Sequence, residues 1–517
     1  MTSGGHPASN FLKFSMNLLQ PGDCIVLEWS LKNFYTGDMA GQVHGSQEFD
    51  LSHPAFDSRL RLVTPVKDTI PYKVFGDSIL VSTVSRGDYR VTQFLRPAYK
   101  NVLDETFTAT DWATKEKVNY STFAGWSDIV KWYDDLTRHK QDNTLELKAL
   151  ADSLFAGCAT PLAKVAKVHE YITGNIRYSY VPFRQSGWIP QEAHDVLATK
   201  IGDCKDMASL GKSLLDYAGI PACLTLVNTE VRHFADHACV GPEFNHCILC
   251  YTINGQDRFL DCTDNNMPLA TLPRQDQGAL ALVIRPGTTG TILLPIDKPE
   301  ARVRRRTVVS TLDEKGTLKE TVATLRTGVF AGNFRDSFRF LAEEKRNVTL
   351  HQSLAQAYPD ITLDTFALQG LNTVSDTLTY NYASTARNTV TFSGNTAIFP
   401  LRISDNIEPN EYPVEEKRTF PIDMYYAWYD ISSCELSGEL TYPATWRPIS
   451  LPDNVSADSP FGSYRLEFKR KGNTLHFKRT AVMNFNAIIP SAEHERLKAF
   501  LNKVSKADAI QLLFYTK

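Results

Sequence analysis

The sequence predicts an α+β protein in which a mixed core of helices and strands is flanked by N- and C-terminal β-sandwich-type domains. Three observations support this class. The chain has 517 residues, more than one hydrophobic core holds, so roughly three domains are expected. Its hydrophobic content of 43% and charged content of 22% are ordinary for a folded protein. Strand-like runs at both ends enclose a middle part with helical spacing.

The N-terminal β-rich domain is expected over residues 1–137. Its strand-like runs carry β-branched and aromatic residues between Gly, Asp and Pro, and they are CIVLEWSL (24–31), RLRLVTP (59–65), YKVFG (72–76) and YRVTQFL (89–95). The spacing then switches and predicts a helix within 121–139. Its aromatic stripe, which includes Trp126, Trp132 and Tyr133, is interpreted as core packing.

The mixed core is expected over residues 138–290. Two helical runs precede IGDCKDMASL (201–210), which begins a helix that ends at Gly219. Three strand-like runs follow, ACLTLVNT (222–229), FNHCILCYTI (244–253) and QDRFLDCT (256–263). Beyond them, a β-rich domain is expected over 300–410, with a helical insertion at 332–357, and a C-terminal β-rich domain over 411–517. The basic run RVRRR (302–306) is interpreted as a solvated strand edge.

Charge and hydropathy exclude several kinds of partner. The net charge is −3 with both signs interspersed, which argues against a nucleic-acid or anionic-membrane partner. No apolar run approaches the roughly 20 residues of a membrane span. The first fifteen residues lack the features of a signal peptide, so the protein is either cytoplasmic or lacks its natural start.

Six of the nine cysteines lie between residues 204 and 262, and Cys204 falls in the first turn of a predicted helix. The positive end of a helix dipole favours a thiolate, the reactive form of the side chain. A small buried apolar residue is the alternative interpretation of Cys204. The choice between the two depends on which side chains lie nearby.

A predicted hairpin supplies such side chains. Asn254-Gly255 between two strand-like runs is a strong hairpin signal, and a two-residue turn there makes the numbers of opposed residues add up to 509. His246 and Asp261 then share one face as diagonal neighbours, about 7–8 Å apart. Cysteine acyl chemistry uses these groups: Cys204 as nucleophile, His246 as proton shuttle and Asp261 to orient the ring. Backbone N–H groups at the helix start can hold the oxyanion.

The motifs GDCKDMASLGKSLLDYAGIPA, FNHCIL and FLDCTD resemble, in order and type, the signature blocks of the transglutaminase-like superfamily. The resemblance covers about residues 145–285 and implies a papain-like core with Cys204, His246 and Asp261 as its triad. Beyond the core, the chain resembles bacterial multidomain proteins with uncharacterised β-domains. Those proteins are typically exported and have a longer N-terminal domain, which implies that this chain begins inside that domain and that the protein is periplasmic or exported. The family usually has proline at position 262, where this chain has cysteine.

Other candidates around the site are weaker. Gln185 and Trp188 are candidate oxyanion donors by residue type and rough location. Cys247 and Cys262 should oppose each other as packed thiols, or as a disulfide if the protein is exported. Cys250 is expected to be a small buried hydrophobe far from His246. The spacing of His233, His237, Cys239, Cys247 and Cys250 matches no zinc motif, so neither a metal nor a cofactor is expected.

The sequence thus predicts a cysteine peptidase or amidase that acts on a peptide or protein substrate through a thioester. Hydrolysis is favoured by analogy with bacterial relatives of the same domain order. Two alternatives stay open: a protein-glutamine transglutaminase with an amine acceptor, and a catalytically inactive binding module of the cell envelope. The sequence does not indicate what the flanking β-domains bind.

Overall fold

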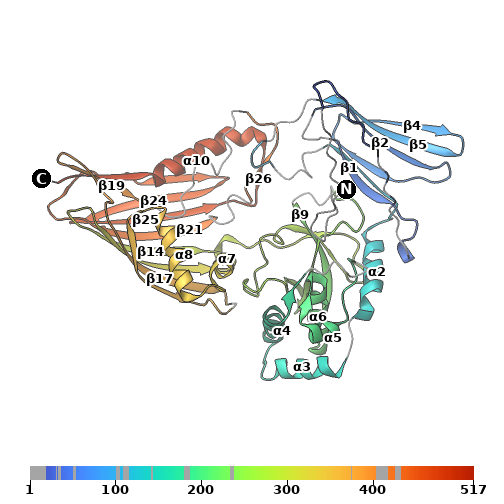
Figure 1. Ribbon diagram of the computed structural model, residues 1–517, viewed down its shortest axis with the longest axis horizontal. Helices are drawn as coiled ribbons and strands as arrows, with labels where there is room; N and C mark the ends of the chain where they lie inside the picture. Colours follow the sequence, from blue (N-terminus) through green and yellow to red (C-terminus); the bar gives the residue numbers. More distant parts are fainter. Residues whose placement is uncertain are drawn as a thin grey trace.

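The computed structural model describes residues 19–516 apart from residues 29, 31, 33–36, 50–53, 100–104, 109–115, 141–143, 180–186, 233–237, 374, 403–416 and 426–431. The molecule is elongated (Figure 1). Sheets from the N-terminal part lie at one end and a large β-rich body lies at the other. Between them, and below them in this view, lies a core of helices and one sheet.

The N-terminal part consists of two three-stranded antiparallel sheets. Their strand orders are β1-β6-β3 and β2-β5-β4. Residues 24–28 form no strand and are exposed, so the strand predicted at the start of the chain is wrong for its described residues. The elements are η1 (Gly37–Met39), β1 (His44–Glu48), β2 (Ala55–Pro65), β3 (Tyr72–Phe75), β4 (Leu80–Arg86), β5 (Tyr89–Tyr99) and β6 (Lys117–Ser121).

The predicted aromatic helix is α2 (Trp126–Thr137), and it leads from these sheets into the core. It buries Ile129, Val130 and Tyr133 in a cluster with residues of the core sheet. The interpretation of its stripe as core packing is therefore confirmed.

The core is one five-stranded antiparallel sheet, in the order β11-β10-β9-β12-β13, with helices packed against it. Helix α6 packs against β9 and β10, and its apolar residues Met207, Leu210 and Leu214 are buried in the core. The elements are η2 (Arg138–Lys140), α3 (Leu145–Phe155), α4 (Pro161–Asn175), β7 (Arg177–Tyr178), α5 (Ala193–Thr199), β8 (Ile201–Gly202), α6 (Cys204–Tyr217), β9 (Ala222–Arg232), β10 (His246–Ile253), β11 (Gln256–Leu260), β12 (Ala279–Val283) and β13 (Ile292–Leu293).

The C-terminal body contains an eight-stranded sheet, β16-β17-β15-β14-β21-β25-β24-β23, and a four-stranded sheet, β18-β19-β27-β22. Its elements are η4 (Pro299–Ala301), β14 (Arg304–Leu312), β15 (Leu318–Thr327), α7 (Val329–Phe338), α8 (Glu343–Ala355), β16 (Ile361–Gln369), β17 (Thr377–Ala386), β18 (Thr391–Ser393), β19 (Thr396–Leu401), β20 (Ile422–Asp423), β21 (Ser433–Thr441), β22 (Arg447–Ser450), β23 (Val455–Ser459), β24 (Gly462–Lys471), β25 (Thr474–Met483), β26 (Ile488–Ile489), η7 (Ser491–Glu493), α10 (His494–Asp508) and β27 (Ile510–Tyr515).

The large sheet crosses the domain boundary expected at residue 410. Strand β14 pairs with β21 in parallel, so strands from before and after this boundary lie side by side. One apolar cluster likewise joins residues from both segments, among them Leu312, Phe399, Leu440 and Leu501. We therefore propose that the two C-terminal domains expected from the sequence form one unit.

The basic run RVRRR is not a solvated edge, and that interpretation is wrong. Strand β14 lies inside the eight-stranded sheet, between β15 and β21. Arg302 is fully buried, and its guanidinium lies 4.4 Å from the ring centroid of Phe485 and 5.1 Å from that of Phe330. Aromatic faces attract a desolvated guanidinium, so Arg302 contributes to the packing of the body.

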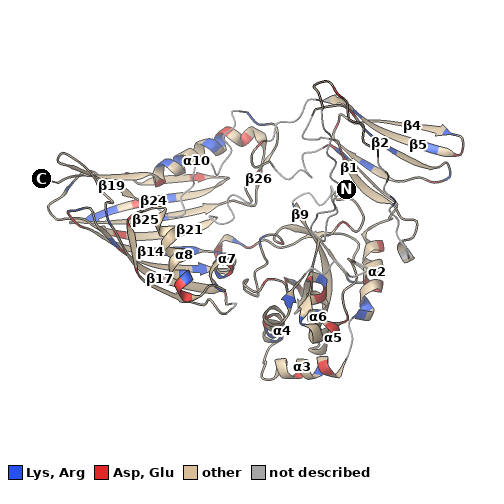
Figure 2. Ribbon diagram, viewed as in Figure 1, with Lys and Arg blue, Asp and Glu red and all other residues tan. Residues whose placement is uncertain are grey.

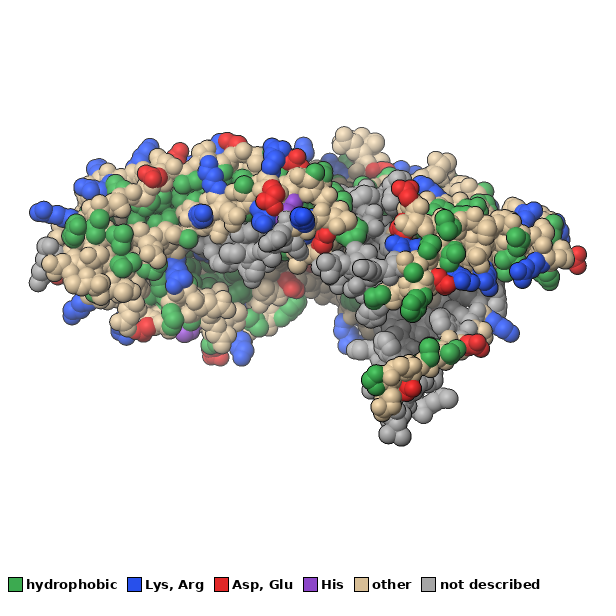
Figure 3. Space-filling view, turned by 90° about the horizontal axis from the view of Figure 1, so that it is seen from above, with side chains coloured by type: hydrophobic (Ala, Val, Ile, Leu, Met, Phe, Trp, Pro, Cys, Tyr) green, Lys and Arg blue, Asp and Glu red, His purple; other side chains and the backbone are tan. Residues whose placement is uncertain are grey.

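The surface carries no large patch of one charge in the views shown. Basic and acidic residues are scattered along the ribbon (Figure 2), and they are interspersed over the upper face of the molecule (Figure 3). Within the part of the chain that the structure describes, no helix is long and apolar enough to cross a membrane.

Candidate active site

Cys204 is the first residue of α6, and the sequence around it explains why the helix begins there. Asp203 is the N-cap: its Oδ1 accepts the N–H of Asp206 at 3.3 Å, and its own N–H donates to Asp206 Oδ2 at 2.9 Å. This reciprocal pair is a capping box, and it holds the thiol at the positive end of the helix. Cys204 is partly buried and packs against a cluster that includes Tyr133 and Cys247.

Asp206 also attaches a second segment to the start of the helix. Its Oδ1 accepts the backbone N–H of Gln191 at 2.7 Å, and its Oδ2 accepts the Gln191 side-chain amide at 3.0 Å. Asp206 is completely buried, so these hydrogen bonds satisfy a carboxylate that solvent does not reach. One acidic side chain thus fixes both the helix start and the chain that precedes α5.

The predicted hairpin register is confirmed. Strands β10 and β11 pair from Leu249 with Leu260 to Ile253 with Gln256, so the numbers of opposed residues add up to 509. The turn residues Asn254 and Gly255 both have positive φ, 53° and 74°, as a type I′ turn requires. His246 is the first residue of β10, and Asp261 follows the last residue of β11.

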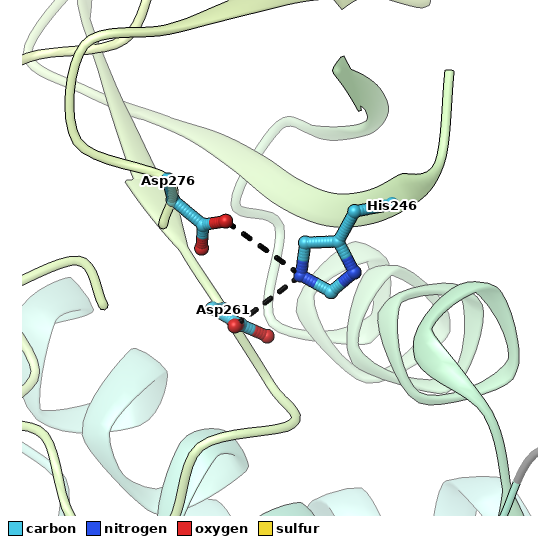
Figure 4. Close-up of side chains that lie close together, drawn as sticks. All are labelled: His246, Asp261 and Asp276. Carbon is cyan, nitrogen blue, oxygen red and sulfur yellow. Dashed lines mark hydrogen bonds and ion pairs between the residues drawn. The ribbon is translucent and has the colours of Figure 1, made fainter. Parts of the chain in front are cut away.

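The structure brings His246 and Asp261 together. His246 Nε2 lies 3.3 Å from Asp261 Oδ2. The other carboxylate oxygen, Oδ1, accepts the N–H of Thr263 at 2.8 Å and its hydroxyl at 2.7 Å. Both oxygens of Asp261 are therefore committed, and the carboxylate is fixed against the imidazole. The second ring nitrogen of His246 points away from the acid (Figure 4).

Each member of this pair stabilises the charged form of the other. Burial lowers the pKa of His246, but the negative charge of Asp261 and hydrogen bonds to Asp261 and to the Cys204 thiol outweigh it, so the pKa lies well above its ordinary value. Burial raises the pKa of Asp261, and the charge of His246 more than reverses this, so that pKa is lowered. An imidazolium next to a carboxylate is therefore the state of this pair that is favoured at neutral pH.

A second acid, Asp276, lies at the same imidazole, and the sequence analysis missed it. Its Oδ1 is 3.9 Å from His246 Nε2, and the side chain is fully buried (Figure 4). Burial and the neighbouring charge of Asp261 raise the pKa of Asp276 well above its ordinary value. Two adjacent carboxyl groups cannot both ionise easily, so Asp261 carries the charge and Asp276 carries the proton.

A buried arginine and the C-terminal body hold the loop that carries Asp276. Arg232, the last residue of β9, donates from Nη2 to the carbonyl oxygens of Gln275 at 2.7 Å and Arg274 at 3.2 Å. The ring of Tyr425, which is fully buried, lies 4.3 Å from the guanidinium, and the Tyr425 hydroxyl donates to Arg274 O at 2.6 Å. Tyr425, which is 151 positions after Arg274 in the sequence, thus helps to place Asp276.

We expect Asp276→Asn to change how stability depends on pH. The folded pKa of Asp276 is raised, so its contribution to stability is fully present below the unfolded pKa, about 3.9, and is lost as pH rises through the folded pKa. Asparagine does not titrate. Relative to wild type, the variant should gain up to about 1.4 kcal/mol of unfolding free energy per pH unit above pH 5. Urea unfolding between pH 5 and 8 measures this, and a flat or opposite trend contradicts the assignment.

His246, Asp261 and Asp276 are also close enough to be considered as metal ligands. One ligand atom from each lies within 4.8 Å of the others, and this is the only such group among the described residues. A metal ligand must be deprotonated, so a cation here would first require Asp276, whose pKa is raised by burial and by Asp261, to lose its proton. Of the residues considered for zinc, His233 and His237 lie outside the described residues, and Cys239, Cys247 and Cys250 form no such group within them.

The remaining candidates differ in outcome. Gln185 lies outside the described residues. The Trp188 ring packs edge-on against Trp132, with the ring centroids 5.5 Å apart, so its role as an oxyanion donor stays a prediction. Cys247 and Cys262 are buried free thiols in two different apolar clusters. Cys250 is completely buried, four residues along β10 from His246.

Two family models match parts of the chain. Residues 148–245 match the transglutaminase-like superfamily, and residues 395–514 match a domain of unknown function, DUF3858. No curated protein matches the chain.

One solved structure shares the fold over most of the chain at low sequence identity. The crystal structure of a candidate protease from Parabacteroides distasonis has a TM-score of 0.58 at 14% identity, covering 92% of this chain and 75% of that one. A candidate cysteine protease from Cytophaga hutchinsonii (TM-score 0.22, 16% identity, 48% and 80% covered) and the periplasmic domain of TgpA from Pseudomonas aeruginosa (0.19, 16%, 41% and 72%) are also matched. Residues 148–245, in the core that β-rich regions flank on both sides, are thus similar to the transglutaminase-like superfamily.

Proposed function

We propose that this protein is a cysteine-dependent acyl-transfer enzyme that hydrolyses a peptide or amide bond through a thioester on Cys204. One observation carries the proposal. A largely buried imidazole, held by a fixed carboxylate at 3.3 Å, lies near Cys204 at the first position of a helix, and the Cys204 side chain helps to raise the pKa of that imidazole. Nucleophile, base and orienting acid are the three groups that this chemistry needs.

Each group has one task in the proposed reaction. The Cys204 thiolate attacks the acyl carbon, and the Cys204 N–H at the start of α6 stabilises the oxyanion. The His246 imidazolium donates its proton to the leaving amine, which departs and leaves a thioester. His246 then removes a proton from the attacking water, and the acid product leaves the thiol. Asp261 keeps the ring oriented and stabilises its positive charge in both steps.

Hydrolysis is proposed ahead of transamidation because the Parabacteroides distasonis neighbour, which shares the fold over most of this chain, is named a candidate protease. The two reactions have the same thioester and differ only in the acceptor, water or an amine. In the third possibility, an inactive binding module, the side chains lie together but no thioester forms.

A peptide library separates these three possibilities. The protein is incubated with a diverse library in ¹⁸O-enriched water, with and without an added primary amine, and the products are identified by mass. New C-termini that contain ¹⁸O are expected and support hydrolysis. Isopeptide cross-links or amine adducts without new termini would instead assign a transglutaminase, and an unchanged library would reject both enzymatic functions.

A further inference from the structure

A pair of cysteines lies on the core sheet away from the candidate active site. Cys223 of β9 pairs directly with Cys250 of β10, and both are free thiols. Thr252 and Pro221 are the opposed residues two positions further along the same pair of strands. The Thr252 N–H donates to Pro221 O at 2.9 Å, so these two residues form a hydrogen-bonded pair. Since such pairs recur every second residue, Cys223 and Cys250 form another, with Cα atoms about 5.5 Å apart. A disulfide spans this distance.

An arginine lies against both sulfur atoms. Arg285 Nη2 is 3.7 Å from Cys223 Sγ and 3.6 Å from Cys250 Sγ. The same guanidinium donates two hydrogen bonds to the carboxylate of Asp257 of β11, at 2.9 and 3.0 Å. A cation held next to a thiol stabilises the thiolate, the form that reacts with oxidants.

The two thiols are not equivalent. A hydrogen bond from Cys250 and the charge of Arg285 together lower the pKa of Cys223 to about 7, against the effect of burial. The same hydrogen bond, with burial, raises the pKa of Cys250. Cys223 is 7% exposed and Cys250 is completely buried. Cys223 is therefore the thiolate that a small oxidant reaches, and Cys250 is the thiol next to it.

Cys247 of β10 and Cys262, two residues after the end of β11, differ from this pair of thiols. Both are buried, and burial raises the pKa of each. They lie in separate apolar clusters. They are a natural internal comparison for Cys223 and Cys250.

We propose that Cys223 and Cys250 form a redox-modification site, a dithiol that a hydroperoxide oxidises to a cross-strand disulfide. The Cys223 thiolate attacks the peroxide O–O bond, which gives a sulfenic acid and releases hydroxide or alkoxide. The Cys250 sulfur then attacks the sulfenic sulfur, the S–S bond forms, and the hydroxyl leaves as water with the Cys250 proton. Two thiols lose two electrons in total and the peroxide gains them. Cys204 takes no part, so the site does not depend on the proposed function.

The test is a disulfide map after oxidation. The full chain and its Cys204→Ala variant, both reduced, are treated with hydrogen peroxide, alkylated with N-ethylmaleimide in denaturant, digested and analysed by mass. A linked Cys223–Cys250 peptide pair is expected in both proteins, reversible by dithiothreitol, with Cys247 and Cys262 recovered as alkylated thiols. Absence of the link, or a link between Cys247 and Cys262 formed equally fast, overturns the proposal.

Three variants test the roles within the site. Cys250→Ser should leave a sulfenic acid on Cys223 that dimedone captures, with no bridge. Arg285→Gln should slow bridge formation about tenfold, since the thiolate fraction falls. Arg258→Gln is the matched control, because Arg258 is an exposed arginine next to Asp257 on β11 and should leave the rate unchanged. Equal rates in the two arginine variants, or failure of dimedone to label Cys223, contradict the mechanism.

Discussion

Cys204→Ser is expected to lower the turnover of any peptide or amide substrate by at least about a thousandfold while the fold stays intact. A serine hydroxyl next to an imidazolium is not ionised at neutral pH, so the variant keeps the shape of the side chain and loses the nucleophile. The helix start does not depend on the sulfur, because Asp203 and Asp206 cap it through each other. Product formation by mass and circular dichroism measure the two effects.

Cys250→Ser is the matched control for this variant. Cys250 lies four residues along β10 from His246, which places the two Cα atoms about 13–14 Å apart, too far for direct proton exchange. The variant should keep nearly full activity under reducing conditions, with at most a modest loss of stability from a poorly satisfied hydroxyl. Activity that survives Cys204→Ser but not Cys250→Ser would identify a different nucleophile.

Asp261→Asn and Asp276→Asn make the same chemical change next to the same imidazole. We expect a large loss of activity from the first variant and almost none from the second. Asp261 is the ionised partner, and its amide variant loses the charge that holds His246 protonated and oriented, at a cost of about 10²–10⁴ in kcat. Asp276 carries a proton, so asparagine replaces one neutral group with another and should change kcat by no more than about threefold.

Both side chains are buried next to His246, so a buried amide should disturb the structure to a similar extent in the two variants. A difference in kcat between them therefore reports the charge of each acid. Steady-state kinetics of both variants, with their melting temperatures, measure the difference. Equal losses in the two variants would mean that Asp276 is ionised and that the distribution of charge between the two acids is wrong.

The parts of the site that local sequence rules determine could be predicted. Asn254-Gly255 fixes a two-residue turn, the turn fixes the register, and the register places His246 near Asp261. The Gly202-Asp203 break and the apolar spacing after Cys204 likewise fix the start of α6. Local sequence rules do not predict that the hairpin packs against the start of α6. That part of the prediction rests on the resemblance to a known family.

Asp276 could not be found in this way. It lies in a loop without periodicity, and its place depends on Arg232 at the end of β9 and on Tyr425 from the C-terminal part. These contacts join segments far apart in the sequence, and no spacing rule connects them. The burial of Arg302 could not be predicted for a related reason. Arginines are usually solvated, but here aromatic rings from two other segments pack against the guanidinium.

The most direct test of the account is the pH dependence of Cys204 alkylation by limiting iodoacetamide. It is measured in a Cys223→Ser/Cys250→Ser background, with and without His246→Gln, and each cysteine is quantified by peptide mass. We predict that Cys204 is labelled before every other cysteine, and that His246→Gln slows its labelling by at least about tenfold at pH 6, where a thiolate needs the imidazolium most. First labelling of another cysteine, or equal Cys204 rates with and without His246, would contradict the proposed nucleophile and its activation.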